Sequence, residues 1–167
     1  MRKILLFIFI GIFLFSGLTF AQSAGKIGFV DLSRAFDEYN KTKDFDKELE
    51  KKGDIKQVDR EKLVKEIRNM RDEMELMNEK ARETKEKDIE AKIKTLQEFD
   101  QDTKTVLTKE RDDMVKDILK EMNSVIQEYG KNQGYSIILN DRVLLYGDPA
   151  EDLTDKIIKI LNDSYKK

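Results

Sequence analysis

Cysteine, histidine and tryptophan are absent from this chain of 167 residues, and proline occurs once. Without histidine or cysteine, the chain cannot build an ordinary zinc site, a cysteine nucleophile or a serine–histidine pair. It also has no G-x-x-x-x-G-K-[ST] stretch, which a phosphate-binding P-loop requires. No carboxylate stands in an apolar setting that would tune it as a general acid or base. These absences argue against an enzyme and predict neither a metal nor a cofactor.

Charge is abundant but is not of one sign. About 40% of the residues are charged, with 32 basic against 34 acidic side chains in the whole chain. Such a mixture is typical of long solvated helices rather than of a thick globular core. Because no basic stripe is present, nucleic acid is not expected as a partner.

The N-terminus has the pattern of an export signal. Arg2 and Lys3 are followed by an almost purely apolar run over residues 4–20, and small residues allow cleavage after Ala21 or Ala24. We therefore predict a signal peptide over residues 1–21 and a periplasmic mature chain. The alternative is an uncleaved anchor, because about 17 apolar residues approach the length that spans a bilayer.

The long central region predicts two helices. Between residues 41 and 129 there is no proline and one glycine, Gly53. Apolar residues follow the a/d spacing of a coiled coil, first at Leu63, Ile67, Met70, Met74, Met77 and Ala81, and later from Ile89 onwards. Residues 79–88 contain one alanine and no larger apolar side chain, and polar Asp100, Thr103 and Glu110 interrupt the second half of the seam.

Both ends of the chain predict short strands. Residues 26–32 are apolar and partly β-branched, and residues 135–139 and 143–146 flank Asn140 and Asp141 as in a β-hairpin. A lone hairpin is marginal in water, so the distant strands need each other. A straight helix would hold them more than about 100 Å apart. We therefore predict that the helix reverses near residues 79–88, which makes residues 41–127 an antiparallel hairpin arm.

Residues 25–40 and 128–167 then form a small β-sheet body with a terminal helix, in an α+β fold. In that helix, Leu153, Ile157, Ile160 and Leu161 form an apolar stripe. A body of this size without disulfides usually needs oligomerisation for stability. The residues predicted to build the oligomerisation body are Ile27, Phe29, Val30, Ile137, Leu139, Leu144 and Tyr146.

The stretches KIGFVDLSRAF, YSIILNDRVLLYG and DLTDKIIKIL, together with the charged arm between them, resemble the Skp/OmpH family of periplasmic chaperones. The resemblance implies a jellyfish-like homotrimer with a central β body and three helical tentacles. It also implies an ATP-independent holdase that binds unfolded outer-membrane β-barrel proteins and delivers them towards the outer membrane. Well-known family members are basic, whereas this chain without Arg2 and Lys3 is slightly acidic. We therefore carry over no site for anionic lipid or lipopolysaccharide.

Three apolar residues of the arm, Phe45, Phe99 and Val106, are the best candidates for contact with clients. Met70, Met74 and Met77 have two interpretations: they fill the seam between the helices, or they offer a compliant apolar surface to clients of no fixed sequence. A different class of function also remains open, namely a coiled-coil structural or adaptor protein of the cell envelope, anchored by an uncleaved N-terminal segment.

Overall fold

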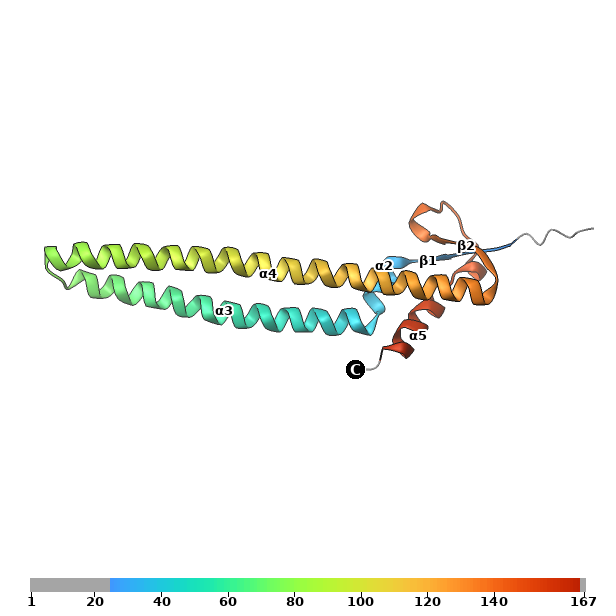
Figure 1. The fold of residues 1–167 in the computed structure, drawn as a ribbon, viewed down its shortest axis with the longest axis horizontal. Coiled ribbons are helices and arrows are strands. Elements are labelled where there is room, and N and C mark those ends of the chain that lie inside the picture. Colours follow the sequence, from blue (N-terminus) through green and yellow to red (C-terminus); the bar gives the residue numbers. More distant parts are fainter. Residues whose placement is uncertain (1–24, 166–167) are drawn as a thin grey trace, which may run out of the picture.

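The computed structural model describes residues 25–165. The predicted signal peptide lies outside these described residues. The main elements follow one another as β1 (Lys26–Val30), α2 (Leu32–Glu38), α3 (Asn40–Glu75), α4 (Glu79–Gln133), β2 (Tyr135–Asn140) and α5 (Thr154–Ser164). Two 3-10 turns, η1 (Asp141–Val143) and η2 (Pro149–Glu151), lie between β2 and α5. Figure 1 shows one long hairpin of α3 and α4 with a small body at one end.

The arm reverses direction over residues 76–78, just before the range in which the sequence predicted the turn. The Asn78 side chain caps α4 by accepting a hydrogen bond from the Ala81 N–H at 3.0 Å. The Arg82 guanidinium donates to the backbone carbonyls of Met74 and Glu75 at the end of α3. These two side chains satisfy the helix ends, so the turn needs neither glycine nor proline. The apolar-poor residues after it are the first turns of α4.

The two strands flank the arm in sequence and pair in parallel, with Ile27 opposite Ile137 and Phe29 opposite Leu139. This confirms that the distant strands meet because the helical region folds back. Gly134 ends α4 in the left-handed conformation, with φ of 73°, and directs the chain into β2. The arm is therefore the crossover connection between two neighbouring strands.

The predicted hairpin of residues 135–139 and 143–146 is wrong. The Asn140 side chain accepts a hydrogen bond from the Arg142 N–H, and the Leu144 N–H donates to the Asp141 carbonyl at 2.9 Å. This closes η1, and the following residues form no strand with β2. Among the described residues the sheet has two strands, β1 and β2. Local side-chain-to-backbone bonding therefore prevails over the β propensity of residues 143–146.

The core lies between the inner face of the sheet, α2, α5 and the base of α4. Its fully enclosed side chains are Val30, Ala35, Tyr39, Ile118, Met122, Leu153, Ile157 and Leu161. The Leu153 N–H donates to the Phe29 carbonyl at 2.9 Å, and the Asp31 N–H donates to Thr154 Oγ1 at 2.9 Å. These two bonds tie the start of α5 to β1. The terminal helix thus covers one face of the sheet, as its apolar stripe predicted, although Ile160 of that stripe is exposed.

Candidate functional site

The arm is packed at its two ends and open in its middle. Near the body, Ile118 and Met122 of α4 are buried, and near the tip Ile67 and Ile89 are buried. No side chain of residues 43–66 or 90–117 reaches that degree of burial. In the middle of the arm the apolar seam, with Leu63, Leu96 and Leu107, is therefore only half-buried.

Ion pairs between the helices occupy that middle. Asp100 and Glu110, the acidic residues that interrupt the apolar seam of α4, each form an ion pair with a basic residue of α3. Arg60 Nε lies 2.9 Å from Asp100 Oδ1, and Lys52 Nζ lies 2.9 Å from Glu110 Oε2. Similar pairs continue towards both ends, namely Lys41–Glu121, Glu66–Lys92 and Glu73–Lys85. All of them join α3 to α4 in one antiparallel register. Each half-exposed pair contributes little stability, about 0–1 kcal/mol, but a wrong register would place like charges together.

Apolar side chains remain in contact with solvent along this open middle. Val106, predicted as a client contact, is half exposed, and Phe45 and Phe99 are partly exposed. The Lys56 ammonium lies 5.5 Å from the centre of the Phe99 ring. The sequence analysis missed Ile55, which is 62% exposed, and Val58. Extended back from Leu63, the heptad seam passes through Arg60 and Lys56, so Ile55 and Val58 lie off the seam. This off-seam position is the feature of the sequence that could have indicated their exposure.

The methionines divide by position along the arm. Met122 is buried in the body core and Met114 packs against that core. Met70, Met74 and Met77 are half-buried near the tip, so they lie partly within the seam and partly in contact with solvent. Leu76, which the sequence analysis did not select, is 91% exposed at the reversal itself. The tip therefore combines methionine side chains with one freely exposed leucine.

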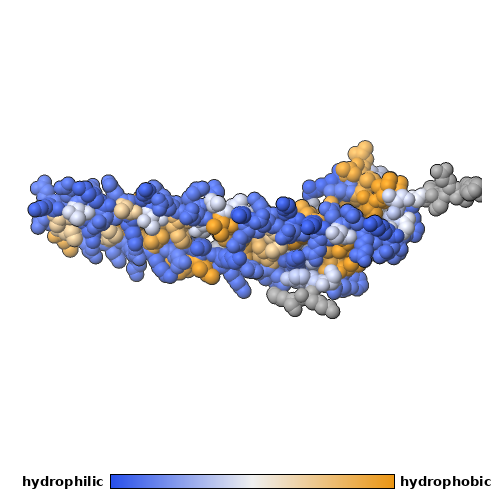
Figure 2. Space-filling view, in the orientation of Figure 1, coloured by the Kyte–Doolittle hydropathy of each residue, from blue (hydrophilic) through white to orange (hydrophobic). Residues whose placement is uncertain are grey.

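The body has an apolar outer face that its own helices leave open. Four of the residues predicted for oligomerisation, Ile27, Phe29, Ile137 and Leu139, alternate with the core-facing positions and lie opposite one another in the sheet register. Ile27 and Ile137 are about half exposed. Val30 lies on the other face, enclosed in the core. Figure 2 shows apolar side chains gathered over the body, whereas most of the arm surface is hydrophilic.

Residues 143–146 extend this apolar surface beyond the sheet. Leu144 is half-buried, while Val143, Leu145 and Tyr146 are among the most exposed large apolar side chains. The chain then returns across the outer face of the sheet at Gly147, where an added Cβ would lie 2.6 Å from Phe29 Cε1. A side chain at this position would therefore force the Phe29 ring to shift. Residues 143–146 therefore project from the sheet as a short apolar segment fixed at both ends.

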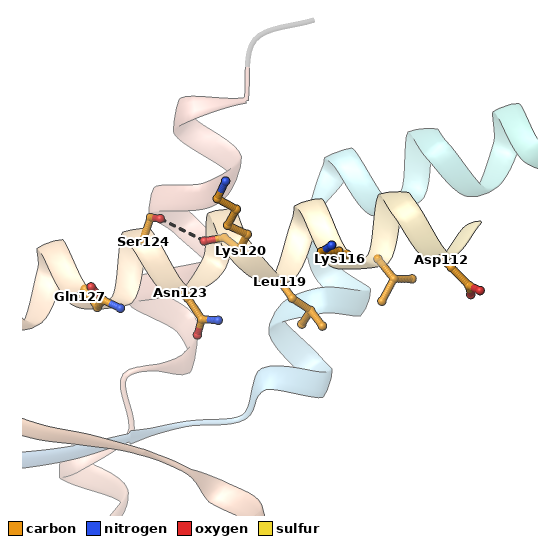
Figure 3. Close-up of a pocket in the computed structure, with 8 residues that line it drawn as sticks. Asp112, Lys116, Leu119, Lys120, Asn123, Ser124 and Gln127 are labelled. Atoms are coloured by element: carbon orange, nitrogen blue, oxygen red, sulfur yellow. Dashed lines mark hydrogen bonds between the residues drawn. The ribbon is translucent and has the colours of Figure 1, made fainter. Parts of the chain in front are cut away.

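A groove lies at the base of the arm, between α2 and α4. We define the basal groove by Leu32 and Phe36 of α2 and by Val115 and Leu119 of α4; Asn140 and Arg142 close one end of it. The Arg142 guanidinium donates a hydrogen bond to Ser33 Oγ and so holds η1 against α2. Figure 3 shows an adjoining pocket along α4, which shares Val115 and Leu119 with the groove and is otherwise lined by polar side chains such as Lys116 and Asn123. The sequence did not predict the groove. Val115 and Leu119 lie outside the seam of α4, and they line a groove only because α2 packs beside them.

The joint between arm and body is built on a buried tyrosine. Tyr39 stands between α2 and α3, and its hydroxyl donates to Glu121 Oε1 at 2.9 Å. The Lys41 ammonium donates to Glu121 Oε2 at 2.6 Å. Burial, followed by the bond to Glu121, raises the pKa of Tyr39. Burial alone would raise the pKa of Glu121, but the hydrogen bonds from Lys41 and Tyr39 outweigh it and lower that pKa.

The described residues show no sign of metal chemistry and no membrane span. No cluster of three or more acidic side chains among residues 25–165 could hold a metal ion. Within the same residues, no helix combines the length and the apolar character needed to cross a membrane. The features that remain as candidate functional surfaces are thus the open arm, the outer face of the sheet and the basal groove.

The fold is that of an arm-and-body protein. A long antiparallel helical hairpin connects two parallel strands of a small body. The family model for outer membrane protein (OmpH-like) matches residues 26–161, and the chain belongs to this family. Among solved structures, the crystal structure of a candidate outer membrane chaperone (OmpH-like) from Caulobacter crescentus has a similar fold, with a TM-score of 0.79 at 17% identity. The match covers 89% of this chain and 93% of that one. No curated protein matches the chain.

Proposed function

We propose that this protein is an ATP-independent periplasmic holdase that binds unfolded outer-membrane β-barrel proteins and prevents their aggregation. The observation that supports this most strongly is the open middle of the arm, where Ile55, Val58 and Val106 stay exposed between helices that are joined by ion pairs. Such a surface offers many weak apolar contacts and no fixed pocket, which suits clients without a common sequence. Membership of the OmpH-like family supports the same function.

The proposed mechanism requires no chemical step. Three arms around one cavity bind a client by multivalency, so that contacts too weak to hold it singly retain it together. The charged surface of the arms keeps the loaded complex soluble. Release occurs when the client folds into the membrane, because its apolar outer face finds a better environment there.

The proposed oligomer is a homotrimer assembled through the body. Its support is the apolar outer face of the sheet, which the helices of a single chain leave open and on which Ile27 and Ile137 are about half exposed. Monomeric soluble proteins rarely expose large contiguous apolar patches. Phe29, Leu139, Leu144 and Tyr146 extend this face, whereas Val30 supports it from the core side.

The decisive experiment measures light scattering after a urea-unfolded outer-membrane barrel protein is diluted into buffer with residues 22–167 and no nucleotide. We expect suppression of aggregation that saturates near one chaperone oligomer per client. Unchanged aggregation over a wide range of ratios and salt concentrations would contradict a holdase and favour a structural or adaptor protein of the envelope.

A matched pair of deletions tests the cavity. Removing residues 57–63 together with residues 97–103 takes one heptad from each helix and shortens the arm by about 10 Å. It removes the Arg60–Asp100 pair but keeps Lys52–Glu110 and Glu66–Lys92 in register. We expect an intact oligomer that fails first with the largest clients. The double variant V58S/F99S in the full-length arm is the control for the candidate client-contact side chains that the deletion also removes. Equal retention of all clients by the shortened arm would rule out the cavity.

A further inference from the structure

The tip of the arm gathers most of the sulfur atoms of the described residues. We call Met70, Met74 and Met77 the tip methionines. The other two methionines among residues 25–165 are Met114 and Met122, near the body. The Met77 N–H donates to the Met74 carbonyl at 3.1 Å, so a helical turn continues past the end of α3. Steps of four and three residues therefore keep the tip methionines on one side of the helix.

The tip methionines are the groups that an oxidant reaches and oxidises most easily. Cysteine, the usual first target, is absent from the chain, as are histidine and tryptophan. The tip methionines are partly exposed, whereas Met122 in the core has no exposed surface. Figure 1 shows the tip at the end of the arm far from the body, so association through the body leaves it accessible. Oxidant reactivity is thus concentrated at the tip.

The same side chains help to keep the end of the arm closed. Ile67 and Ile89 are the buried apolar side chains of the arm closest to the tip. Beyond them, polar contacts join the helices: the Arg82 guanidinium donates to the carbonyls that end α3, and Lys85 Nζ lies 2.5 Å from Glu73 Oε2. Such exposed polar contacts stabilise a structure only weakly. The partial burial of the tip methionines in the seam is therefore the main apolar contribution to closing the tip.

Oxidation by a peroxide would remove that contribution. A lone pair of the thioether sulfur attacks one oxygen of hydrogen peroxide, the O–O bond breaks, and proton transfer leaves a sulfoxide and one water molecule. Sulfur loses two electrons and the peroxide gains them. The product is a polar side chain with a strong acceptor oxygen. Burying this oxygen in an apolar seam without a donor costs free energy, so the oxidised side chain turns towards solvent.

We propose that the tip methionines are a site of reversible oxidation, and that their sulfoxides open the end of the arm as far as Ile67 and Ile89. Beyond these two residues the ends of α3 and α4 separate, while the ion pairs nearer the body keep the rest of the arm closed. A methionine sulfoxide reductase reverses the reaction and lets the tip close again. This inference does not depend on the proposed binding of clients.

Hydrogen peroxide itself is the probe in a direct test. Residues 22–167 are treated with dilute peroxide, and peptide mass spectrometry follows the addition of oxygen at each methionine. We expect the tip methionines to be oxidised first and Met122 last. Hydrogen exchange of the oxidised protein should be about tenfold faster over residues 70–88 and unchanged over residues 43–66. Treatment with methionine sulfoxide reductase should restore the original exchange rates.

Three variants serve as controls. M70L/M74L/M77L keeps the seam apolar and should show no peroxide effect on exchange, whereas Met114→Leu should respond as the parent does. M70Q/M74Q/M77Q places polar side chains in the seam and should open the tip without any oxidant.

Each step of the inference has an outcome that would overturn it. Oxygen addition at Met122 as fast as at the tip would overturn the order of oxidation. Unchanged exchange over residues 70–88 after complete oxidation of the tip methionines would overturn the opening. An equal response of M70L/M74L/M77L would assign the effect of peroxide to other side chains.

Discussion

The body and the middle of the arm use opposite means to hold two helices together. In the body, α5, α2 and the base of α4 enclose Ile118, Met122 and Leu161 with no residual exposure. In the middle of the arm, α3 and α4 are joined by pairs such as Arg60–Asp100 and Lys52–Glu110, and none of the side chains is fully enclosed. Close packing gives the body its stability, while charge pairing gives the arm a register and leaves its apolar side chains available. In the proposed function, stability is therefore supplied by the body and client contact by the arm.

The largest expected effect comes from the core of the body. Ile118→Ala removes a fully enclosed side chain and should lower the free energy of unfolding by about 2–5 kcal/mol, through lost burial and the cavity that remains. Urea unfolding followed by circular dichroism measures it. Val106→Ala, on the same helix but half exposed, is the matched control and should change stability by less than about 1 kcal/mol. Equal losses for the two variants would contradict the contrast between body and arm.

The exposed side chains of the arm should matter for binding rather than stability. The triple variant I55S/V58S/V106S should unfold within about 1 kcal/mol of the parent, because these side chains are already about half exposed or more. Its affinity for an unfolded barrel protein should fall about tenfold, which corresponds to about 1.4 kcal/mol. Fluorescence titration with a labelled client measures this. An unchanged affinity would remove the middle of the arm from the client surface.

The ion pairs should act on register with a smaller effect. Arg60→Glu places two carboxylates together at Asp100 and should destabilise the arm by about 0.5–1 kcal/mol. The double variant R60E/D100R restores an opposite pair and should recover most of that loss. A double-mutant cycle by thermal unfolding at low salt gives the coupling energy, and high salt should reduce it. Failure of the double variant to recover would show that the pair does not set the register.

The smallest effect is expected at the joint between arm and body. Because the pKa of Glu121 is lower in the folded protein than its ordinary value of 4.5, its ionised form stabilises the fold. That contribution is present at neutral pH and is lost as the pH falls below about 4.5 and the carboxylate takes up a proton. It should amount to less than about 1 kcal/mol, since Glu121 is partly exposed. Glu121→Gln should flatten this part of the acid dependence, measured as the urea midpoint between pH 6 and 3.

Much of the arm could be predicted from spacing alone. Leu63, Ile67 and Met70 recur at steps that only a helix places on one side, and this was enough to predict a hairpin once the strands had to meet. The place of the reversal was predicted a few residues too late, because the absence of large apolar side chains after Glu79 reflects the solvated end of the arm. Spacing places Ile55 and Val58 off the seam but does not show that they are exposed, since an off-seam apolar residue can be buried or exposed depending on its neighbours.

The body was predicted less completely because its contacts are non-local. The pairing of Ile27 with Ile137 and the covering of the sheet by Ile157 follow from short apolar runs that cannot be stable alone. The hairpin was wrong because the Asn140 side chain and the η1 turn direct Val143 away from β2. The basal groove could not be predicted at all, since it depends on where α2 comes to lie against Leu119.

The sequence by itself determined that two charged helices share an apolar seam and that distant strands must be brought together, because periodicity and the instability of isolated strands are local properties of the chain. The tertiary structure alone decided which apolar residues remain in solvent, which charges face one another as Arg60 and Asp100 do, and where the basal groove lies. These depend on the relative position of segments separated in sequence by as many as 124 residues, and that position is set by packing across the whole body.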